Sequence, residues 1–318
     1  MTVLGLGSSI EDGSRHVDAV TGRAMGTDVH VIVVGGPSGS ALDARAEIDR
    51  YEGLWSRFRS DSELSVVNAA AGRPTVVSTA TVDAIAYACD AHHETEGVFD
   101  PTVLSSMIDA GYDRDFSSLS DDAPGAAAPA PGLSGVTIDR AARTVQLPAG
   151  VGLDLGGIAK GLTADLIVAA VLEAGAAGCC VNIGGDLRVG GDAPSGDGWL
   201  VDYPLVDGGH GRLTLQDGAV CTSATTKRRW RSALGNEHHI RSPRTGQSLD
   251  TDLASLTVVA ARAAQADVLT KVGLAAGAAG LERAIGDRGA TGRAVTIAGE
   301  EIVLIGFDRF HVEAPVRV

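Results

Sequence analysis

Apolar residues recur at helical spacing in several segments of the chain. Between residues 38 and 59 they step by three and four positions, which places them on one face of an amphipathic helix. The residues concerned are Ala44, Ile48, Tyr51, Trp55 and Phe58. The same reasoning predicts helices over residues 79–93 and 263–285. A polar segment at 60–64 predicts the cap of a short helix that ends near Asn68.

Short apolar runs between glycines and polar residues predict strands elsewhere in the chain. Hairpins are frequent, and strands and helices mix without a regular βαβ repeat. This pattern favours an α+β fold with mostly antiparallel sheets and packed helices. We expect a flexible N-terminus over residues 1–14, a single domain over 15–318 and a surface loop over about 121–135, which is rich in Ala, Pro and Gly. The predicted strands are 17–23, 29–34, 136–138, 144–147, 179–183, 199–203, 213–215, 219–222, 253–260, 294–297 and 301–305.

One glycine-rich segment, residues 154–165, combines the end of a strand-like run, Gly156-Gly157 and the start of a helix that carries Lys160. Glycine lets backbone approach a ligand closely, and a helix N-terminus offers unpaired N–H groups to phosphate oxygens. The segment matches neither the dinucleotide fingerprint nor the P-loop, so tight packing of a helix start remains an alternative. Only residues 160, 227 and 271 are lysines among the 26 basic residues, which favours the phosphate-binding interpretation for Lys160.

Composition narrows the possible partners. The formal net charge of −14 argues against nucleic acid or an anionic membrane as the main partner, although the basic cluster at residues 227–231 could still serve one anionic ligand. No apolar run reaches the length of a membrane-spanning helix, and the first 20 residues lack the features of a signal peptide, so we expect a cytoplasmic protein. The four cysteines form no CxxC pair, which favours buried hydrophobic roles over a zinc site or disulfides. The neighbours Cys179 and Cys180 should face opposite sides of a strand.

Eight short motifs, taken in their order, resemble the ApbE family of FAD:protein FMN transferases over about residues 17–305. The motifs are Met25-Gly26-Thr27; Ser56-Arg57-Phe58-Arg59 with Asp61-Ser62-Glu63-Leu64 and Asn68; Phe99-Asp100-Pro101; residues 154–161; Asn182 with Gly184-Gly185-Asp186; Thr222-Ser223; His239 with Pro243-Arg244-Thr245-Gly246; and Ala266-Asp267.

The resemblance implies an ApbE-like fold and a magnesium-dependent reaction. A threonine or serine hydroxyl of an acceptor protein attacks the pyrophosphate of FAD, FMN becomes attached through a phosphoester, and AMP leaves. Such phosphate chemistry depends on positioning and charge neutralisation, which glycine turns, lysine and a metal ion can supply.

The resemblance also implies roles for individual residues. His239 would activate the incoming hydroxyl, because imidazole titrates near neutral pH, and Asp267 would share in catalysis. Gly157, through its carbonyl, and the side chains of Asp267 and Thr270 would bind Mg²⁺. His238 and His239 should face opposite sides of a strand, so at most one of them serves the reaction. The residues expected to bind FAD are Met25, Phe58, Val98, Phe99, Asp100, Asp154, Lys160, Gly185, Thr222, Ser223 and Arg241. For Phe58 the alternative is a core position of its helix, and for Asp154 a helix N-cap.

Three positions depart from the family pattern. Ala224 stands where glycine is usual, so a positive φ there would be costly. The segment 239–243 has Arg241 and Ser242 where the family has an apolar and an acidic residue. Lys271 stands four residues after Asp267, where the family has threonine. Asp267 and Lys271 could form a surface ion pair, or the ammonium could lie in the ligand site and compete with the metal. Thr270 could then restore chelation.

Two other functions remain open at this point: an FAD-binding protein without catalysis, and a pyrophosphatase that splits FAD into FMN and AMP. The departures favour the binding protein, whereas His239, Asp154 and Asp267 favour an enzyme. We expect FAD as the substrate, an acceptor protein as the partner and no nucleic acid. The sequence does not identify the acceptor.

Overall fold

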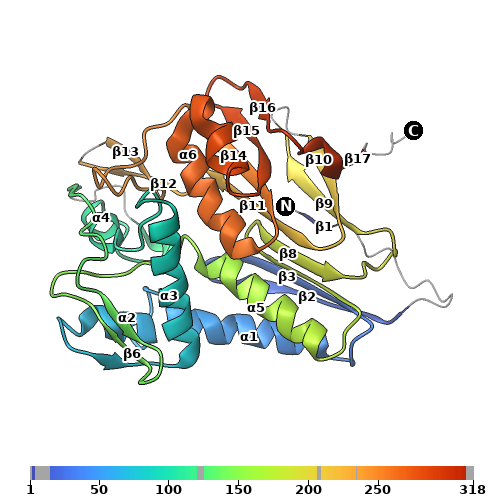
Figure 1. Ribbon diagram of the computed structural model, residues 1–318, viewed down its shortest axis with the longest axis horizontal. Helices are drawn as coiled ribbons and strands as arrows, with labels where there is room; N and C mark the ends of the chain where they lie inside the picture. Colours follow the sequence, from blue (N-terminus) through green and yellow to red (C-terminus); the bar gives the residue numbers. More distant parts are fainter. Residues whose placement is uncertain (1, 4–14, 120–124, 206–208, 234, 313–318) are drawn as a thin grey trace.

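An antiparallel sheet of eight strands runs through the centre of the computed structural model, which describes residues 2–3, 15–119, 125–205, 209–233 and 235–312 (Figure 1). All neighbours in this sheet pair antiparallel, as the frequent hairpins predicted. In spatial order the strands are β16 (Glu301–Val303), β15 (Thr291–Thr296), β14 (Leu253–Ala260), β11 (Gly218–Ala224), β8 (Asp186–Gly191), β7 (Gly178–Ile183), β3 (Thr27–Val34) and β2 (Val17–Ala24).

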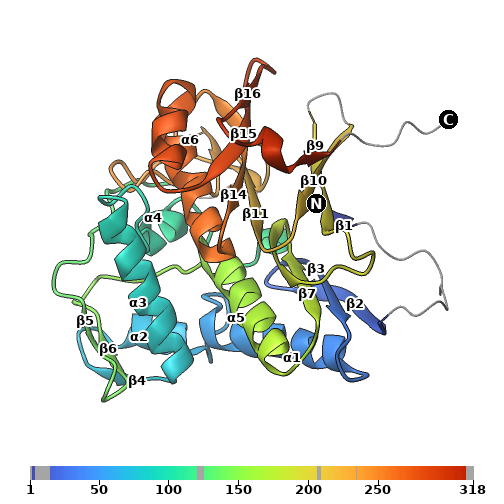
Figure 2. The ribbon, with the colours of Figure 1, turned by 45° about the vertical axis from the view of Figure 1, so that its right-hand side comes forward.

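Helices α1 (Ser40–Trp55), α5 (Ala159–Glu173) and α6 (Ala263–Gly286) cover one face of this sheet. Helix α5 crosses β7 and β8, and α6 lies on β11 and β14. Helices α2 (Glu63–Ala69) and α3 (Thr79–Glu94) lie to one side of α5, together with a small sheet (Figure 2). The small sheet consists of β4 (Thr75–Val76), β6 (Thr144–Gln146) and β5 (Thr137–Asp139).

The opposite face of the sheet packs on a second sheet. Its strands are β1 (Thr2–Val3), β9 (Trp199–Pro204), β10 (His210–Leu215) and β17 (His311–Val312). Alternate residues of the central strands therefore enter two different cores. Cys179 belongs to the helical core and Cys180 to the core between the sheets, as their adjacency on a strand predicted. All four cysteines are buried and free, and burial raises the pKa of each thiol.

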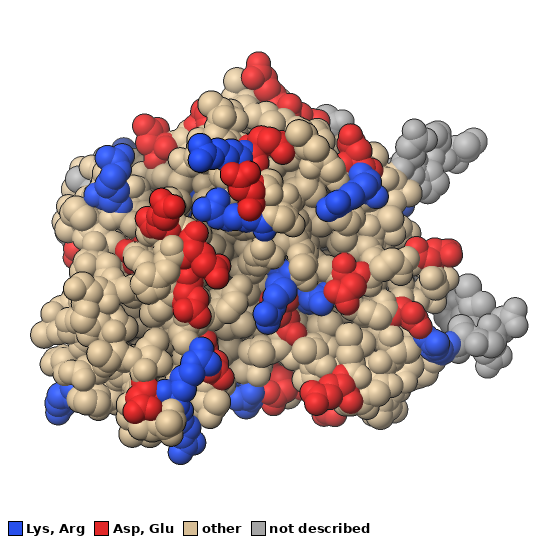
Figure 3. Space-filling model, viewed as in Figure 1, with Lys and Arg blue, Asp and Glu red and all other residues tan. Residues whose placement is uncertain are grey.

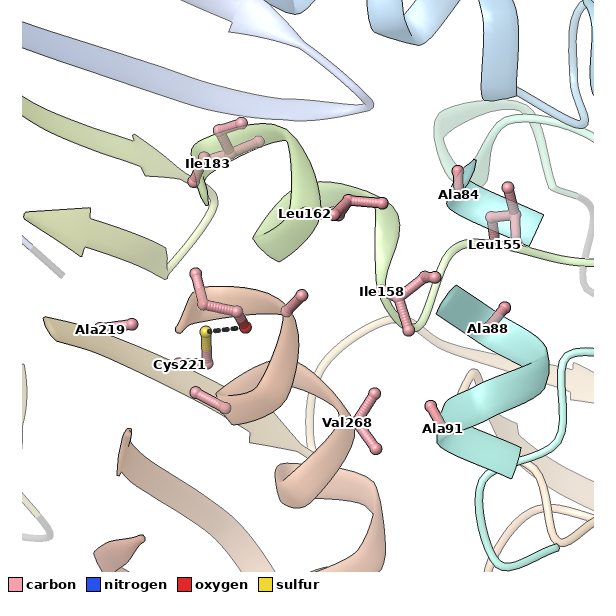
Figure 4. Close-up of a cluster of buried hydrophobic side chains, with 14 of the residues drawn as sticks. Ala84, Ala88, Ala91, Leu155, Ile158, Leu162, Ile183, Ala219, Cys221 and Val268 are labelled. Carbon is pink, nitrogen blue, oxygen red and sulfur yellow. Dashed lines mark hydrogen bonds between the residues drawn. The ribbon is translucent and has the colours of Figure 1, made fainter. Parts of the chain in front are cut away.

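The helical core fixes the start of α5 (Figure 4). Ile158 and Leu162 lie between the small side chains of α3 and the first turns of α6, and Cys221 donates to the Ala263 carbonyl at 3.3 Å. Gly161 brings α5 close to α6: a Cβ there would lie 2.4 Å from the Ala263 oxygen. This glycine therefore serves tight helix packing, the alternative that the sequence left open, rather than ligand approach.

The remaining elements close one end of the molecule. They are α4 (Leu104–Asp109), η1 (Phe116–Ser118) and the hairpin of β12 (Arg229–Ser232) and β13 (Gly235–His238). The short helix η2 (Asp308–Phe310) lies elsewhere, beside β10. Acidic and basic side chains intermix over the face drawn in Figure 3. Among the described residues, no helix has both the length and the apolar character needed to traverse a bilayer.

Several boundaries differ from the sequence predictions. The helix predicted over 38–59 ends at Trp55, so Phe58 lies in the following loop and is not a helical core position. Helix α6 contains a break at Gly277, where φ is 65° and a continuous helix was predicted. Ser62 caps α2 by accepting from the Ser65 N–H at 3.0 Å, as predicted.

Two predicted flexible or exposed segments lie partly outside the described residues. Residues 4–14 and 120–124 are not described. Within the predicted N-terminal segment, Thr2–Val3 pairs with β9. Within the predicted loop, residues 125–135 carry no helix or strand and are mostly exposed. They also pack on the turn at Gly246, where a Cβ would lie 1.9 Å from the Ala128 oxygen.

Candidate active site

A cavity of about 550 Å³ opens where the start of α5, the end of β11 and the loop after β13 meet. Most predicted site residues line it: Met25, Phe58, Val98, Phe99, Asp100, Asp154, Gly157, Lys160, Thr222, Ser223, His239 and Arg241. Gly185, Asp267 and Thr270 are buried behind its wall. Their neighbours Gly184, Asp186 and Lys271 line it instead.

The turn between β2 and β3 brings Met25 to the cavity. Met25 and Gly26 are its two central residues, with φ of 50° and 68°, which is the type I′ pattern of a tight hairpin. The turn after β7 packs against it, because a Cβ on Gly184 would lie 2.4 Å from Thr27 Oγ1. A methionine with positive φ costs backbone energy, so this side chain is held in place by its surroundings.

Asp154 is held by an arginine rather than by the helix that follows. Arg57 Nε lies 2.9 Å from Asp154 Oδ2, and both side chains are nearly enclosed. The other carboxylate oxygen accepts from the Gly156 N–H at 2.7 Å. Helix α5 begins at Ala159 with Ile158 at the N-cap position, so the alternative reading of Asp154 as the N-cap is wrong.

Beside this pair, aromatic rings form one wall of the cavity. The Arg57 guanidinium lies over the rings of Phe58 at 4.1 Å and Tyr112 at 4.6 Å. Tyr112 in turn packs on Trp230 of β12, with ring centroids 5.3 Å apart. Phe58 is 40% exposed, which leaves its ring available for stacking on a planar ligand.

Phe99 lies against the glycine turn, whereas its neighbour Asp100 bonds elsewhere. A Cβ on Gly157 would lie 3.0 Å from Phe99 Cε2, so a side chain at position 157 requires the ring to move. Asp100 Oδ1 accepts from the backbone N–H and the hydroxyl of Thr102 at 2.8 and 2.7 Å. Its other oxygen lies 3.6 Å from His92 Nδ1. The Asp100 carboxylate is therefore engaged mainly within its own turn.

Two lysines and two aspartates meet at the inner end of the cavity. Lys160 of α5 forms an ion pair with Asp186 at the start of β8, and its Nζ lies 3.7 Å from Asp267 Oδ2. Lys271 forms an ion pair with Asp267 Oδ1 and donates to the Asp267 main-chain oxygen at 2.9 Å. Asp267 is only 1% exposed, so its pair with Lys271 is buried and is not the surface ion pair considered from the sequence.

The charges of this cluster act on one another. Burial opposes the charge on Lys160, but the Asp186 and Asp267 carboxylates outweigh burial and raise the pKa of Lys160. Burial, and then the charge of Asp186, raise the pKa of Asp267, while the two ammonium groups act in the opposite direction. Asp267 Oδ2 is buried and has no hydrogen-bond partner among the described residues.

Thr270 and Ser223 bond to each other. Their hydroxyl oxygens are 2.7 Å apart, and the Thr270 hydroxyl also donates to the Asp267 carbonyl at 2.7 Å. Thr270 is completely buried. Its hydroxyl is therefore engaged inside the protein and does not take the position that chelation from Thr270 would require. Thr222, one residue earlier in β11, bonds to Thr257 of β14 at 2.9 Å.

The residues present do not fit a magnesium ion. Magnesium requires close to six oxygen ligands in a near-octahedral arrangement. Here the Lys271 ammonium already binds one carboxylate oxygen and the main-chain oxygen of Asp267, so these two oxygens are not free to bind a metal. The stem of Lys271 also fills the space toward the glycine turn, because a Cβ on Gly157 would lie 3.7 Å from Lys271 Cε. The described residues include no group of three or more His, Cys, Asp or Glu side chains able to hold a metal.

His239 follows β13 and lines the cavity, whereas His238 does not. Burial, and then the positive charges of Arg228, Lys271 and Lys160, lower the pKa of His239 well below its usual value. Its Nδ1 is buried without a hydrogen-bond partner among the described residues. His238 instead bonds through Nε2 to the Leu249 carbonyl at 3.1 Å. The two imidazoles therefore have separate surroundings, and only His239 is a neutral base at the cavity.

Arg241 supports the loop that carries His239. Its guanidinium is completely enclosed, forms an ion pair with Glu237 at 2.5 Å, and donates through Nε to the Gly246 carbonyl at 3.1 Å. This arrangement favours a positioning role over the direct FAD contact predicted from the resemblance. Ala224 lies in β11 and has no positive φ, so the cost considered for a missing glycine does not arise.

The structure adds site residues to which the sequence assigned no role. Arg57, Tyr112 and Asp186 line the cavity. Arg228, from the basic cluster that the sequence offered as a site for an anionic ligand, lines it as well. Arg228 has a positive φ of 47°, the same uncommon conformation as Met25. Arg57 and Asp186 stand inside quoted motifs, which was the available signal. Tyr112 carried no signal, because the residues that bring it to the cavity wall, Arg57 and Trp230, lie more than 50 positions away in the sequence.

Solved structures of other proteins share this fold. The ApbE protein of Thermotoga maritima aligns with a TM-score of 0.82 at 24% identity, over 94% of this chain and 100% of that one. The flavinyl transferase ApbE of Pseudomonas stutzeri, in its apo form, aligns with a TM-score of 0.80 at 21% identity, over 96% and 100%. The fold is therefore that of the ApbE-like α+β proteins, as predicted.

Sequence relatives agree with the fold. An FAD:protein FMN transferase of Klebsiella pneumoniae is 29% identical over 232 residues, covering 70% of this chain and 71% of that protein. One of Vibrio cholerae is 28% identical over 253 residues, covering 76% and 75%. The profile of the ApbE family matches residues 25–291, and the chain belongs to that family. The predicted family is confirmed, and the predicted transferase class agrees with these relatives.

Proposed function

We propose that the protein is an FAD:protein FMN transferase, which moves FMN from FAD to a threonine or serine hydroxyl of an acceptor protein. The observation that carries this proposal is the position of His239. Its buried Nδ1 has no hydrogen-bond partner among the described residues, and its imidazole lines the cavity together with Lys160 and Lys271. A base without its own partner can accept a proton from an incoming hydroxyl, and the ammonium groups suit a pyrophosphate.

In this reaction the acceptor oxygen forms a bond to the FMN-side phosphorus of FAD. His239 takes the hydroxyl proton, the bond from that phosphorus to the bridging oxygen breaks, and AMP leaves with the bridging oxygen. Lys160 and Lys271 balance the charge that develops on the phosphate oxygens. The Phe58 ring stacks on a planar part of the dinucleotide. No step is routed through magnesium, because the residues around Asp267 do not fit that ion.

Two other functions make different products. An FAD-binding protein without catalysis leaves FAD unchanged, and a pyrophosphatase gives FMN and AMP with water as the acceptor. The free Nδ1 of His239 favours an enzyme over a binding protein. The depth of the lysine cluster, with both lysine side chains under 20% exposed, favours protection from water over hydrolysis.

The test is incubation of the purified protein with FAD and a library of threonine- and serine-containing peptides. A parallel reaction contains the protein and FAD but no peptide, so that water is the only acceptor. Flavin fluorescence that co-migrates with a peptide, together with equimolar AMP, supports the transferase. FMN and AMP formed at the same rate without peptide would make the protein a pyrophosphatase. Unchanged FAD that remains bound would make it a binding protein.

A further inference from the structure

The positive and negative charges of the ion cluster at the inner end of the cavity balance without a metal ion. Asp186 and Asp267 contribute two negative charges, and Lys160 and Lys271 contribute two positive charges within ion-pair distance. Lys271 stands between Asp267 and Gly157, two of the three residues expected to bind magnesium. The position that the resemblance gives to a divalent cation is therefore taken by an ammonium group of the chain itself.

Both ammonium groups also have N–H donors that are not used within the cluster. A lysine ammonium has three N–H donors. Lys271 directs two of them to oxygens of Asp267, and Lys160 directs one to Asp186. The two side chains are 18% and 16% exposed and line the cavity, so their remaining donors are accessible to a ligand there.

We propose that Lys271, together with Lys160, replaces the divalent cation in this protein and holds the pyrophosphate of FAD, so that FAD binds without magnesium. This inference rests on the proposed function, since it takes FAD as the ligand. A divalent ion at Asp267 would lie within a few ångströms of two ammonium groups, in a buried site where like charges repel strongly. It would also have to displace Lys271 from the two oxygens that this lysine occupies.

Calorimetry with flavin-free protein and FAD, in EDTA and in excess magnesium, tests the proposal. We expect the wild-type Kd to agree within about threefold between the two conditions. Lys271→Met removes the ammonium without adding a ligand, so the affinity for FAD should fall about tenfold or more, and magnesium should not restore it. Lys271→Arg keeps the charge and should keep magnesium-independent binding.

Manganese supplies a readout that does not depend on FAD or on activity. Electron paramagnetic resonance of Mn²⁺ should show no tight binding to the wild-type protein and measurable binding to Lys271→Thr, in which Asp267 loses its ammonium. Lys227→Thr is the matched control, because Lys227 is the third lysine and lines the same cavity without an ion pair to Asp267. It should behave as wild type toward Mn²⁺. Thermal unfolding verifies that each variant is folded.

The outcomes separate this proposal from the function on which it rests. FAD binding to the wild type that needs magnesium, or tight Mn²⁺ binding without FAD, overturns the replacement by Lys271 and leaves the transferase intact. An unchanged FAD affinity in folded Lys271→Met also overturns it. FAD that binds under neither condition overturns both proposals.

Discussion

Asp165 and Asp267 are two buried aspartates on facing helices, and they differ in how their oxygens are used. Asp165 of α5 accepts from the backbone N–H groups of Ala263 and Ala264 at 2.8 and 2.9 Å, one on each oxygen. Arg188 adds an ion pair at 3.3 Å. Asp267 of α6 pairs with lysines, yet its Oδ2 has no hydrogen-bond partner among the described residues.

Burial raises the pKa of both carboxyl groups, so burial alone does not distinguish them. The difference lies in what remains unsatisfied. Asp165 completes the unpaired N–H groups at the start of α6 and joins that helix to α5, which is a structural role. The cluster around Asp267 keeps an oxygen and lysine donors free beside a cavity. Incomplete pairing of buried polar groups costs stability, and it is found where a ligand supplies the missing partners.

The largest effect is expected from His239, whose Nδ1 is likewise unsatisfied. His239→Ala should lower the rate of FMN transfer by about 10²–10⁴-fold, because a positioned base contributes that much. FAD affinity should change little, since the base acts on the acceptor. His238→Ala is the matched control, and comparable transfer rates in the two variants would remove His239 from its proposed role.

Removing the satisfied carboxylate should cost stability rather than function. Asp165→Ala should lower the free energy of unfolding by about 3–5 kcal/mol, because it leaves two helix N–H groups and Arg188 without their buried partner. Asp267→Ala should cost less than about 2 kcal/mol, since the lysines next to it can reach water in the cavity. Urea unfolding measures both values. A larger loss for Asp267→Ala than for Asp165→Ala would contradict the comparison.

The contact between α5 and α6 depends on Gly161, one turn before Asp165. Gly161→Ala should destabilise the protein by about 1–3 kcal/mol, because the new methyl group would overlap the Ala263 carbonyl. Thermal unfolding measures the loss, with Gly53→Ala as the control, because Gly53 lies inside α1 and a Cβ there meets nothing within 4 Å. Equal stability of Gly161→Ala and wild type would mean that the two helices can separate without cost.

The exposed aromatic wall should affect binding but not folding. Phe58→Ala should weaken FAD binding about tenfold, as expected for the loss of one stacking ring. The free energy of unfolding should change by less than about 1 kcal/mol, because the ring is 40% exposed. Fluorescence titration and urea unfolding measure the two quantities. Unchanged FAD affinity would place the planar groups of FAD elsewhere.

The smallest effect concerns pH. Because burial lowers the pKa of His239 well below 6.5, kcat/KM for FMN transfer should show no inflection near that pH. In the unfolded protein the His239 imidazole binds a proton at a higher pH than it does in the folded protein. The free energy of unfolding should therefore decrease as the pH falls below about 6.5. His239→Ala should lessen this decrease. A kcat/KM inflection near 6.5 that belongs to His239 would contradict a pKa lowered by its surroundings.

Local patterns predicted the elements well, because hydrophobic periodicity depends on near neighbours. The two faces of the strand at Cys179 and Cys180, the short helix capped by Ser62 and the hairpin of β15 and β16 all agree with the structure. The helix predicted over 38–59 was too long, because Phe58 continued the apolar spacing while Arg57 turned to Asp154. Asp154 is almost 100 positions away from Arg57 in the sequence, so local periodicity could not predict their ion pair.

The order of its motifs determined the family of this protein, and the spacing of Asp267 and Lys271 determined that they could meet on one helix. Only the tertiary structure decided that this pair is buried, that Lys160 and Asp186 join it from α5 and β8, and that Thr270 turns to Ser223. The structure also decided that the Arg241 guanidinium pairs with Glu237, which the spacing of the two residues alone did not show. Charge and burial at a site depend on which distant elements converge there, and that is a property of packing rather than of spacing.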